Sequence, residues 1–153
     1  MLKFSKKTDY ALIAMRYMYG QGGEHISSAR EIADRYGISY ELVSKILQTL
    51  KRKNVIDSVQ GAAGGYRLSR NLVGFSLLEF IEMIEGPLGV ADCTRAGESA
   101  QCVISPECNV LLPMRELNRR ILSVLRETTL ESLFKDAGPL PSIPARQLAV
   151  GVG

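Results

Sequence analysis

Two short helical patterns separated by a tight turn dominate the first third of the chain. In "SAREIADRYG", Ser28 and Glu31 have the spacing of a capping box, and Gly37 supplies a stop. The next pattern, "SYELVSKILQTLKRKN", opens at Ser39. Its inner face carries Leu42, Val43, Ile46, Leu47 and Leu50. Two helices joined by about three residues that include a glycine predict a helix-turn-helix. The alternative is an ordinary helical hairpin with a solvated basic end.

A β-hairpin is predicted directly after this pair of helices. "VIDSVQ" and "YRLSR" are typical of strands, and "GAAGG" between them is typical of a turn. This glycine turn is not a P-loop, because the Lys-Ser/Thr pair is missing. An earlier helix fits "TDYALIAMRYMYG", with Thr8 or Ser5 as its cap. Its inner face carries Ala11, Ala14, Met15 and Met18. A hairpin after the second helix of a helix-turn-helix is the wing of a winged helix.

The charge distribution favours a polyanionic partner for this region. Residues 1–72 carry 12 Lys/Arg against 6 Asp/Glu, whereas residues 73–153 carry 7 against 10. A helix-turn-helix places the N-terminal part of its second helix in the major groove of DNA. A glycine-rich wing lets the backbone approach DNA closely. The residues that we expect to contact DNA are Ser39, Tyr40, Glu41, Ser44, Lys45, Gln48, Lys51, Arg52, Gly64, Gly65, Tyr66 and Arg67.

Three cysteines lie close together in the second half. Cys93, Cys102 and Cys108 are all the cysteines of the chain, and the segment around them is rich in small and polar residues. An odd number cannot pair fully as disulfides. Thiolates are soft ligands suited to an iron–sulfur cluster or to zinc, and either group needs a fourth ligand. The alternative is three unrelated thiols.

Two further helices are expected around the cysteines. "SLLEFIEMIEGP" has a capping box at Ser76 and Glu79 and an apolar stripe typical of core. "LLPMRELNRRILSVLRETTLESLF" predicts one long helix with Pro113 in its first turn. Its stripe consists of Leu111, Met114, Leu117, Ile121, Val124 and Leu125. A helix this long suits a dimer seam, although it could pack internally. We expect residues 136–153, rich in Pro and Gly, to be a disordered tail.

The chain resembles the IscR/NsrR-type (RirA-like) winged-helix iron–sulfur regulators over residues 1 to 135. The resemblance lies in "KKTDYAL", "LKRKNVIDSVQGAAGGYRLSR", "SLLEFIEMIEGP", the cysteine trio and "TLESLF". It implies a mainly α fold with a small β-hairpin wing. Residues 1–72 would form the DNA-binding domain, and residues 73–135 a connecting helix, a cysteine sensor loop and a dimerisation helix. It also implies a homodimer on palindromic double-stranded DNA, with an iron–sulfur cluster on Cys93, Cys102 and Cys108.

The same resemblance bears on the fourth ligand. IscR-like members have a His three residues after the last cysteine, where this chain has Leu111. "KKTDYAL" matches the motif in which NsrR-like members place a ligating Asp, so the resemblance implies Asp9 of the partner chain. Asp9 could instead simply complement the dipole of the first helix. Asp92 and Glu107 are the next candidates. Three cysteines with an oxygen ligand suit a four-iron cluster, and two-iron sites occur in the family.

We therefore expect a cytoplasmic homodimeric repressor whose DNA binding is controlled by a cluster that senses iron or cluster status, oxidants or nitric oxide. The alternative on the same scaffold is a zinc-binding or thiol-redox regulator. An enzyme is not expected, because the chain has one His, no nucleophile motif and no nucleotide loop. A membrane partner is not expected either, because no apolar run approaches the roughly 20 residues that cross a bilayer.

Overall fold

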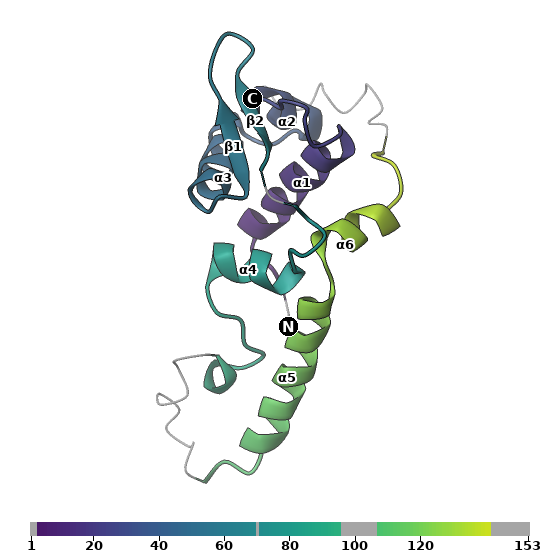
Figure 1. The fold of residues 1–153 in the computed structure, drawn as a ribbon. Coiled ribbons are helices and arrows are strands. Elements are labelled where there is room, and N and C mark those ends of the chain that lie inside the picture. The colour runs from purple at the N-terminus through teal and green to yellow at the C-terminus, as the bar shows by residue number, and fades with distance from the viewer. Residues whose placement is uncertain (1–2, 70, 96–106, 142–153) are drawn as a thin grey trace. The chain divides into compact units, whose positions relative to one another are not determined.

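The computed structural model describes residues 3–69, 71–95 and 107–141, which form two compact units (Figure 1). The N-terminal unit comprises Phe4–Asn71 and the chain from Phe134 onward, and the C-terminal unit comprises Leu72–Leu133 and the residues before Phe4. The elements are α1 (Lys6–Gly20), α2 (Ala29–Tyr36), α3 (Tyr40–Arg52), β1 (Ile56–Val59), β2 (Gly65–Leu68), α4 (Leu77–Glu85), the 3-10 turn η1 (Asp92–Thr94), α5 (Leu111–Glu127) and α6 (Leu130–Asp136). This mainly helical fold with one hairpin is the predicted fold class.

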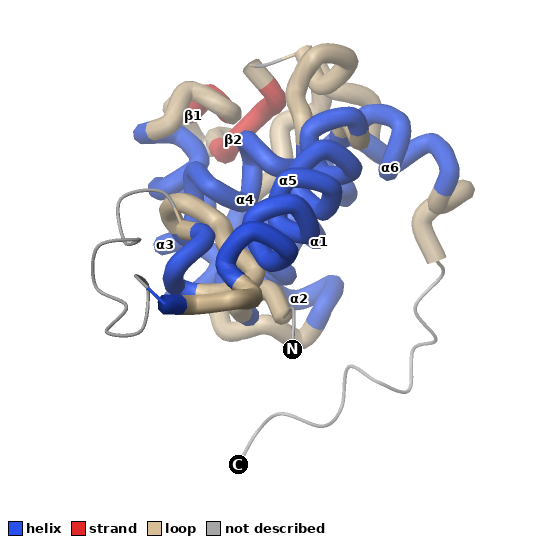
Figure 2. Tube along the Cα trace, turned by 90° about the horizontal axis from the view of Figure 1, so that it is seen from below, coloured by secondary structure: helices blue, strands red, loops and turns tan. Residues whose placement is uncertain are grey.

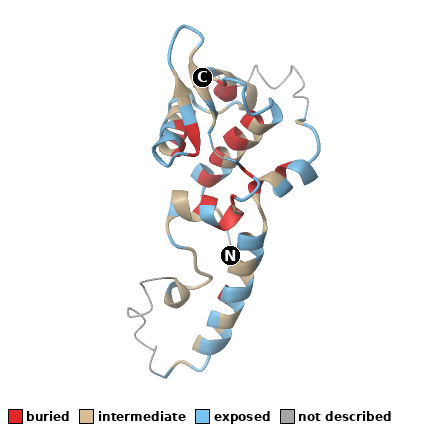
Figure 3. Cartoon of the chain, viewed as in Figure 1, coloured by how far each residue is buried: buried red, intermediate tan, exposed pale blue. Residues whose placement is uncertain are grey.

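Helix α1 begins at the earlier of the two predicted caps. The Ser5 side chain accepts a hydrogen bond from the Thr8 backbone N–H at 3.3 Å, so α1 starts at Lys6. Its predicted inner face is confirmed, because Ala11, Ala14, Met15 and Met18 are all at most 1% exposed. Figure 3 shows buried positions, in red, along α1. α1 packs on α3.

The helix-turn-helix forms as predicted because its boundaries are set locally. The Glu31 N–H donates to Ser28 Oγ at 3.0 Å, and the Ser28 N–H donates to Glu31 Oε2 at 3.3 Å, which completes the capping box. Gly37 ends α2 with a left-handed φ of 62°. Ser39 Oγ then accepts from the Leu42 N–H at 3.2 Å and starts α3. The buried face shared by α2 and α3 consists of Ile32, Ala33, Val43, Ile46, Leu47 and Leu50.

The hairpin is anchored to the chain that precedes α2. β1 and β2, red in Figure 2, pair antiparallel with Ile56 opposite Leu68. The Ser27 N–H donates to the Tyr66 carbonyl, and the Tyr66 N–H donates to the Ser27 carbonyl, both at 2.8 Å. A Cβ on Gly65 would lie 2.6 Å from the Ser27 carbonyl oxygen, so this position admits glycine alone without a backbone shift.

The C-terminal unit is built around α4 and α5. Ser76 caps α4 by accepting from the Glu79 N–H at 3.1 Å. Phe75 and Phe80, both fully buried, meet edge to face with ring centroids 6.0 Å apart. α4 packs on α5, and Pro113 lies in the first turn of α5 as predicted.

The single long C-terminal helix predicted from the sequence is wrong, because the chain forms two helices. α5 ends at Glu127, and Thr128 takes an extended conformation. Its carbonyl accepts from the Leu77 N–H at 2.7 Å, and Thr129 bridges to Ser76. Thr129 Oγ1 then accepts from the Ser132 N–H at 3.1 Å, which starts α6. Backbone pairing with the start of α4 therefore replaces helical hydrogen bonds at this point.

Residues 137–141 follow α6 and belong to the N-terminal unit. Arg16 donates to the Gly138 carbonyl, and Arg35 Nη2 donates to the Pro141 carbonyl at 3.1 Å. The predicted disordered tail thus begins with residues that are hydrogen-bonded to α1 and α2, and its residues 142–153 lie outside the described part of the chain. In the described part, no helix is both long enough and apolar enough to cross a membrane.

Candidate nucleic-acid interface and cysteine site

The outer face of α3 is polar and open to solvent. Its first turn presents Tyr40, whose side chain is 47% exposed. Of the predicted DNA contacts, the structure leaves exposed Ser39, Tyr40, Glu41, Lys45, Gln48, Lys51 and Arg52. Arg52 Nη2 donates to Thr49 Oγ1 at 3.3 Å, which directs this side chain back along α3. The face thus offers hydrogen-bond donors, acceptors and one aromatic ring.

Ser44 departs from the prediction that it is exposed. The residue is only half-buried, but its Oγ is shielded from solvent and has no hydrogen-bond partner among the described residues. The reason is its place on the helix, one turn from Leu47 and next to Val43, which are both buried. Base recognition by Ser44 stays a prediction, and it would need a change that brings the hydroxyl to the surface.

Arg30 lies beside this face and was missed by the sequence analysis. Its guanidinium carbon is 4.8 Å from the centroid of the Tyr40 ring, a cation–π arrangement that joins the start of α2 to the start of α3. A cation in the first turn of a helix is disfavoured by the helix dipole. An arginine in the first turn of the helix predicted at "SAREI" could therefore have indicated a role for Arg30 other than stabilising the helix.

The wing presents one exposed arginine and a close backbone. Arg67 on β2 is opposite Asp57 and lies 3.9 Å from Glu24, whose side chain is 98% exposed. Such an exposed pair contributes little to stability, so Arg67 can exchange this partner for a phosphate at small cost. Gly64, Gly65 and Tyr66 are half-buried, and Tyr66 holds the wing through its backbone.

A partly buried hydrogen-bond network supports the start of α2. Glu31 accepts from the Tyr17 hydroxyl and from the Ser28 N–H, and His25 Nε2 lies 3.6 Å from its Oε1. Burial raises the pKa of Glu31, but the hydrogen bonds from Tyr17, Ser28 and His25 outweigh it and lower the pKa overall. Burial and the bond to Glu31 raise the pKa of Tyr17 to about 12. Glu31 is therefore held as a carboxylate, which keeps the capping box charged.

The cysteines lie at the two described edges of the loop between α4 and α5. Cys93 occupies the centre of η1, Cys108 lies three residues before α5, and both are free and half-buried. Cys102 lies outside the described residues, which end at Arg95 and resume at Glu107. Within the described ranges, no three His, Cys, Asp or Glu side chains gather as a metal-binding group.

The candidates for a fourth ligand have other roles in the described structure. Asp9 is exposed in the first turn of α1, where an acidic residue complements the helix dipole, and Ser5 is the cap. Asp92 lies 3.7 Å from Arg95, an exposed i,i+3 pair. Glu107 is exposed next to Cys108. None of these contacts tests ligation, so Asp9 stays a prediction.

A buried asparagine lies beneath the first cysteine. Asn118 on α5 is 9% exposed, and its Oδ1 accepts from the Val90 N–H at 2.9 Å and lies 3.3 Å from Thr94 Oγ1. The sequence analysis missed it. The available signal was a polar residue on the apolar side of the helix, four residues after Met114 and three before Ile121.

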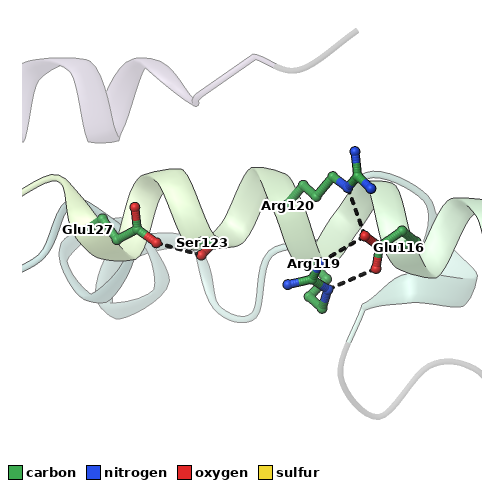
Figure 4. A network of polar contacts seen from close by, with 5 residues as sticks. All are labelled: Glu116, Arg119, Arg120, Ser123 and Glu127. Carbon is green, nitrogen blue, oxygen red and sulfur yellow. Dashed lines mark hydrogen bonds and ion pairs between the residues drawn. The ribbon is translucent and has the colours of Figure 1, made fainter.

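The apolar stripe predicted on α5 divides into two sets. Met114, Ile121 and Leu125 are half-buried within the chain, but Leu117 is 44% exposed and Val124 is 63% exposed. Another face of the helix is polar (Figure 4). There Glu116 accepts from Arg119 at 2.8 Å and from Arg120 at 2.7 Å, and these bonds lower the pKa of Glu116 to about 2.

Comparisons with known proteins fit this arrangement. Residues 4–136 match the model of the Rrf2 family, described as an iron-dependent transcriptional regulator. Protein aau3 of Rhizobium meliloti (strain 1021) is 31% identical over 134 residues, 88% of this chain and 86% of that protein. The HTH-type transcriptional regulator NsrR of Shouchella clausii (strain KSM-K16) is 27% identical over 142 residues, 93% of this chain and 95% of that protein.

Two solved structures have similar folds. CymR, the global cysteine regulator of B. subtilis, aligns with a TM-score of 0.70 at 26% identity and covers 89% of this chain and 98% of its own. IscR of T. potens aligns with a TM-score of 0.69 at 25% identity and covers 95% of this chain and 96% of its own. These similarities confirm the predicted winged-helix fold.

Proposed function

Because the chain belongs to the Rrf2 family of transcriptional regulators, we propose that it is a homodimeric repressor whose DNA binding is controlled by an iron–sulfur cluster. The single observation that carries the sensing part is the pair of free, half-buried thiols of Cys93 and Cys108, which flank one loop. The similarity to NsrR and IscR, together with the iron-dependent description of the family, supports iron as the metal.

The DNA-binding part of the proposal rests on α3 and the wing. Lys45 and Gln48 are exposed on α3, and Lys51 and Arg52 continue the basic surface to the helix end. The wing follows immediately, with Arg67 exposed and the backbone of Gly64 and Gly65 unobstructed by side chains of their own. In our proposal α3 enters the major groove, and the wing lies along the adjacent phosphates.

The donor set fits an iron–sulfur cluster. Cys93, Cys102 and Cys108 supply thiolates, the ligand type that such clusters require, and Asp9 of the second copy supplies the fourth ligand in our proposal. When bound, the cluster supplies a redox-active centre sensitive to oxidants, nitric oxide and iron supply. A carboxylate is a harder and weaker ligand for this iron than a thiolate, so the fourth position would be the labile one.

Dimerisation is proposed through α5. Val110, Leu117 and Val124 follow one another at intervals of seven residues and are 54%, 44% and 63% exposed. A seven-residue apolar repeat places its members on one side of a helix and is typical of a helix–helix seam. Arg120 borders this repeat, three residues after Leu117 and four before Val124, and it is paired with Glu116 at 2.7 Å. Two copies related by a two-fold axis would present two α3 helices to a palindromic site.

A thiol-redox regulator is the second candidate. The similarity to CymR, a cysteine regulator, favours it, because free half-buried thiols can also switch by oxidation without metal. Zinc on the same thiolates is a further form of this alternative. The three forms differ in what the purified protein contains.

Anaerobic purification distinguishes these forms. The proposal expects a coloured protein with iron and sulfide in equal amounts and visible absorption that nitric oxide or oxygen bleaches. Cys93→Ala, Cys102→Ala and Cys108→Ala should each fold, dimerise and lack a stable cluster, and Asp9→Ala should lose or convert it. A colourless protein that contains zinc would contradict the cluster and support the zinc form of the second candidate. A protein without metal, whose DNA binding changes on reversible thiol oxidation, would support the thiol-redox form.

A further inference from the structure

Asn118 occupies a position on α5 that its neighbours fill with apolar side chains. Met114 and Ile121, one turn before and one turn after, are half-buried, and Asn118 is the most buried described residue of the helix. Burying an amide costs free energy unless its oxygen and nitrogen find hydrogen-bond partners. The partners of Asn118 therefore indicate why α5 carries an amide at this position.

Among the described residues, the Asn118 side chain bonds to one short segment. Oδ1 accepts from the Val90 N–H at 2.9 Å and lies 3.3 Å from Thr94 Oγ1, and Nδ2 donates to the Thr94 carbonyl at 3.5 Å. Val90 and Thr94 enclose η1, which holds Cys93. η1 also packs on α5 as an element. One side chain thus holds both ends of the turn that carries the first cysteine.

The turn is closed on itself above this amide. The Ala91 N–H donates to Thr94 Oγ1 at 3.1 Å, and this hydroxyl donates to the Ala91 carbonyl at 2.7 Å. The backbone on either side is in close contact, because a Cβ on Gly89 would lie 2.8 Å from the Arg95 nitrogen. The Thr94 hydroxyl can donate one hydrogen bond, and the Ala91 carbonyl, which is nearer than Asn118 Oδ1, accepts it. The Val90 N–H is therefore the principal donor to Asn118 Oδ1.

We propose that Asn118 is a positioning residue for the metal centre, fixing the Cys93 turn on α5 so that this thiol is presented before any metal binds. The inference rests on the proposed function, in which Cys93 is a ligand. Groups that hold a ligating side chain in place reduce the conformational entropy that is lost when the metal binds, and they slow metal loss. The same bonds connect the ligand turn directly to α5, the helix proposed as the dimer seam.

The first measurement is amide hydrogen exchange of the full-length, reduced, metal-free protein. Asn118→Leu keeps the branching at Cγ but has no acceptor, so the Val90 amide should exchange about tenfold faster, the effect of losing one hydrogen bond. Asn118→Asp keeps an acceptor and should keep Val90 protected. Ser123→Ala is the matched control, because it removes a different polar side chain from α5, one bonded to Glu127. It should leave Val90 unchanged.

Thr94→Val supplies a second, independent variant. It keeps the side-chain shape but opens the closure on Ala91, so exchange of Ala91 and Val90 should rise while α4 and α5 stay protected. A Val90 amide that is equally protected in Asn118→Leu and the parent would overturn the inference. Faster exchange spread evenly over the whole C-terminal unit would overturn it too, because that is the signature of general destabilisation.

The second measurement uses the anaerobically purified protein. Its visible absorption follows cluster loss to an iron chelator, and loss should be about tenfold faster in Asn118→Leu than in the parent or in Ser123→Ala. Asn118→Asp should lie closer to the parent. A parent without iron and sulfide would overturn the proposed function. A parent with a cluster, and an Asn118→Leu variant that loses it at the same rate, would overturn this inference alone.

Discussion

Arg30 is the basic residue whose position is hardest to explain by stability. The helix dipole disfavours a cation in the first turn of α2, yet the Arg30 guanidinium is held over the Tyr40 ring next to the exposed face of α3. A phosphate at this point would be contacted by the Arg30 guanidinium. Arg30→Ala should therefore weaken binding to all DNA sequences alike and reduce the salt slope of log K by about one.

The controls for Arg30 separate charge from stacking. Arg30→Lys keeps the charge and should keep the salt slope, and Tyr40→Phe keeps the ring that Arg30 covers. Lys51→Ala should behave as Arg30→Ala does, whereas Arg126→Ala, exposed on α5, should change nothing. Fluorescence anisotropy at several salt concentrations measures all five variants. An unaltered slope for Arg30→Ala would remove this residue from the interface.

Glu31 gives the chain a predictable response to acid. Its pKa is lowered in the folded state, so its contribution to stability is complete above its ordinary value of 4.5 and is lost as pH falls through the lowered pKa. Glu31→Gln should lower the free energy of unfolding by about 1 kcal/mol at pH 7, a modest amount because solvent screens part of the network. The difference in stability between this variant and the parent should shrink below pH 4.

Denaturant unfolding at pH 7 and pH 3 measures the response of Glu31. Glu24→Gln is the matched control, because Glu24 lies in the loop just before α2 and forms an exposed ion pair with Arg67. It should leave the midpoint unchanged at both pH values. A Glu31→Gln variant whose deficit stayed constant from pH 7 to pH 3 would contradict a role for the charged carboxylate.

At the level of elements, the wing requires glycine at position 65. A Cβ at Gly65 would meet the Ser27 carbonyl oxygen at 2.6 Å, and this carbonyl accepts the bond that ties β2 to the chain before α2. Gly65→Ala should therefore destabilise the fold by about 1–3 kcal/mol and weaken DNA binding further than stability alone explains. Gly74→Ala is the control, because a Cβ there meets nothing within 4 Å. Equal unfolding midpoints for the two variants would contradict this account.

The elements that could be predicted from the sequence are those with local boundaries. Ser28, Glu31 and Gly37 define α2 through hydrogen bonds and a backbone angle that involve near neighbours in sequence. The break between α5 and α6 could not be predicted in this way. It depends on Thr128 accepting from Leu77, about fifty residues earlier in the chain.

The candidate site shows the same division. The exposed face of α3 follows from helical periodicity, whereas the shielded hydroxyl of Ser44 depends on packing at the edge of the buried stripe. Asn118 was visible as a polar residue at an apolar position, but only its partners, Val90 and Thr94, reveal that it holds the Cys93 turn. Long-range partners are the information that residue types and spacing do not contain.

For the whole molecule, the exposed seven-residue repeat on α5 predicts how two copies associate. Val110, Leu117 and Val124 repeat at seven-residue intervals and are exposed, while Arg115 and Arg126 lie on the other side of the helix. Leu117→Glu would place a charge in the centre of the proposed two-fold seam, where the second copy would bring the same charge. We expect this variant to be monomeric with unchanged helicity, because the stripe makes few contacts within its own chain.

Loss of the dimer has a consequence for DNA binding that separates this prediction from a local effect on α5. A dimer binds two half-sites at once, so a monomer loses the gain in effective concentration and should bind a palindrome no better than a half-site. Arg115→Glu is the matched control, since it makes a larger charge change on the same helix away from the stripe, and it should stay dimeric. Native mass spectrometry gives the assembly, and anisotropy compares palindrome with half-site. A Leu117→Glu variant that keeps the parent's mass and its preference for the palindrome would place the dimer seam elsewhere.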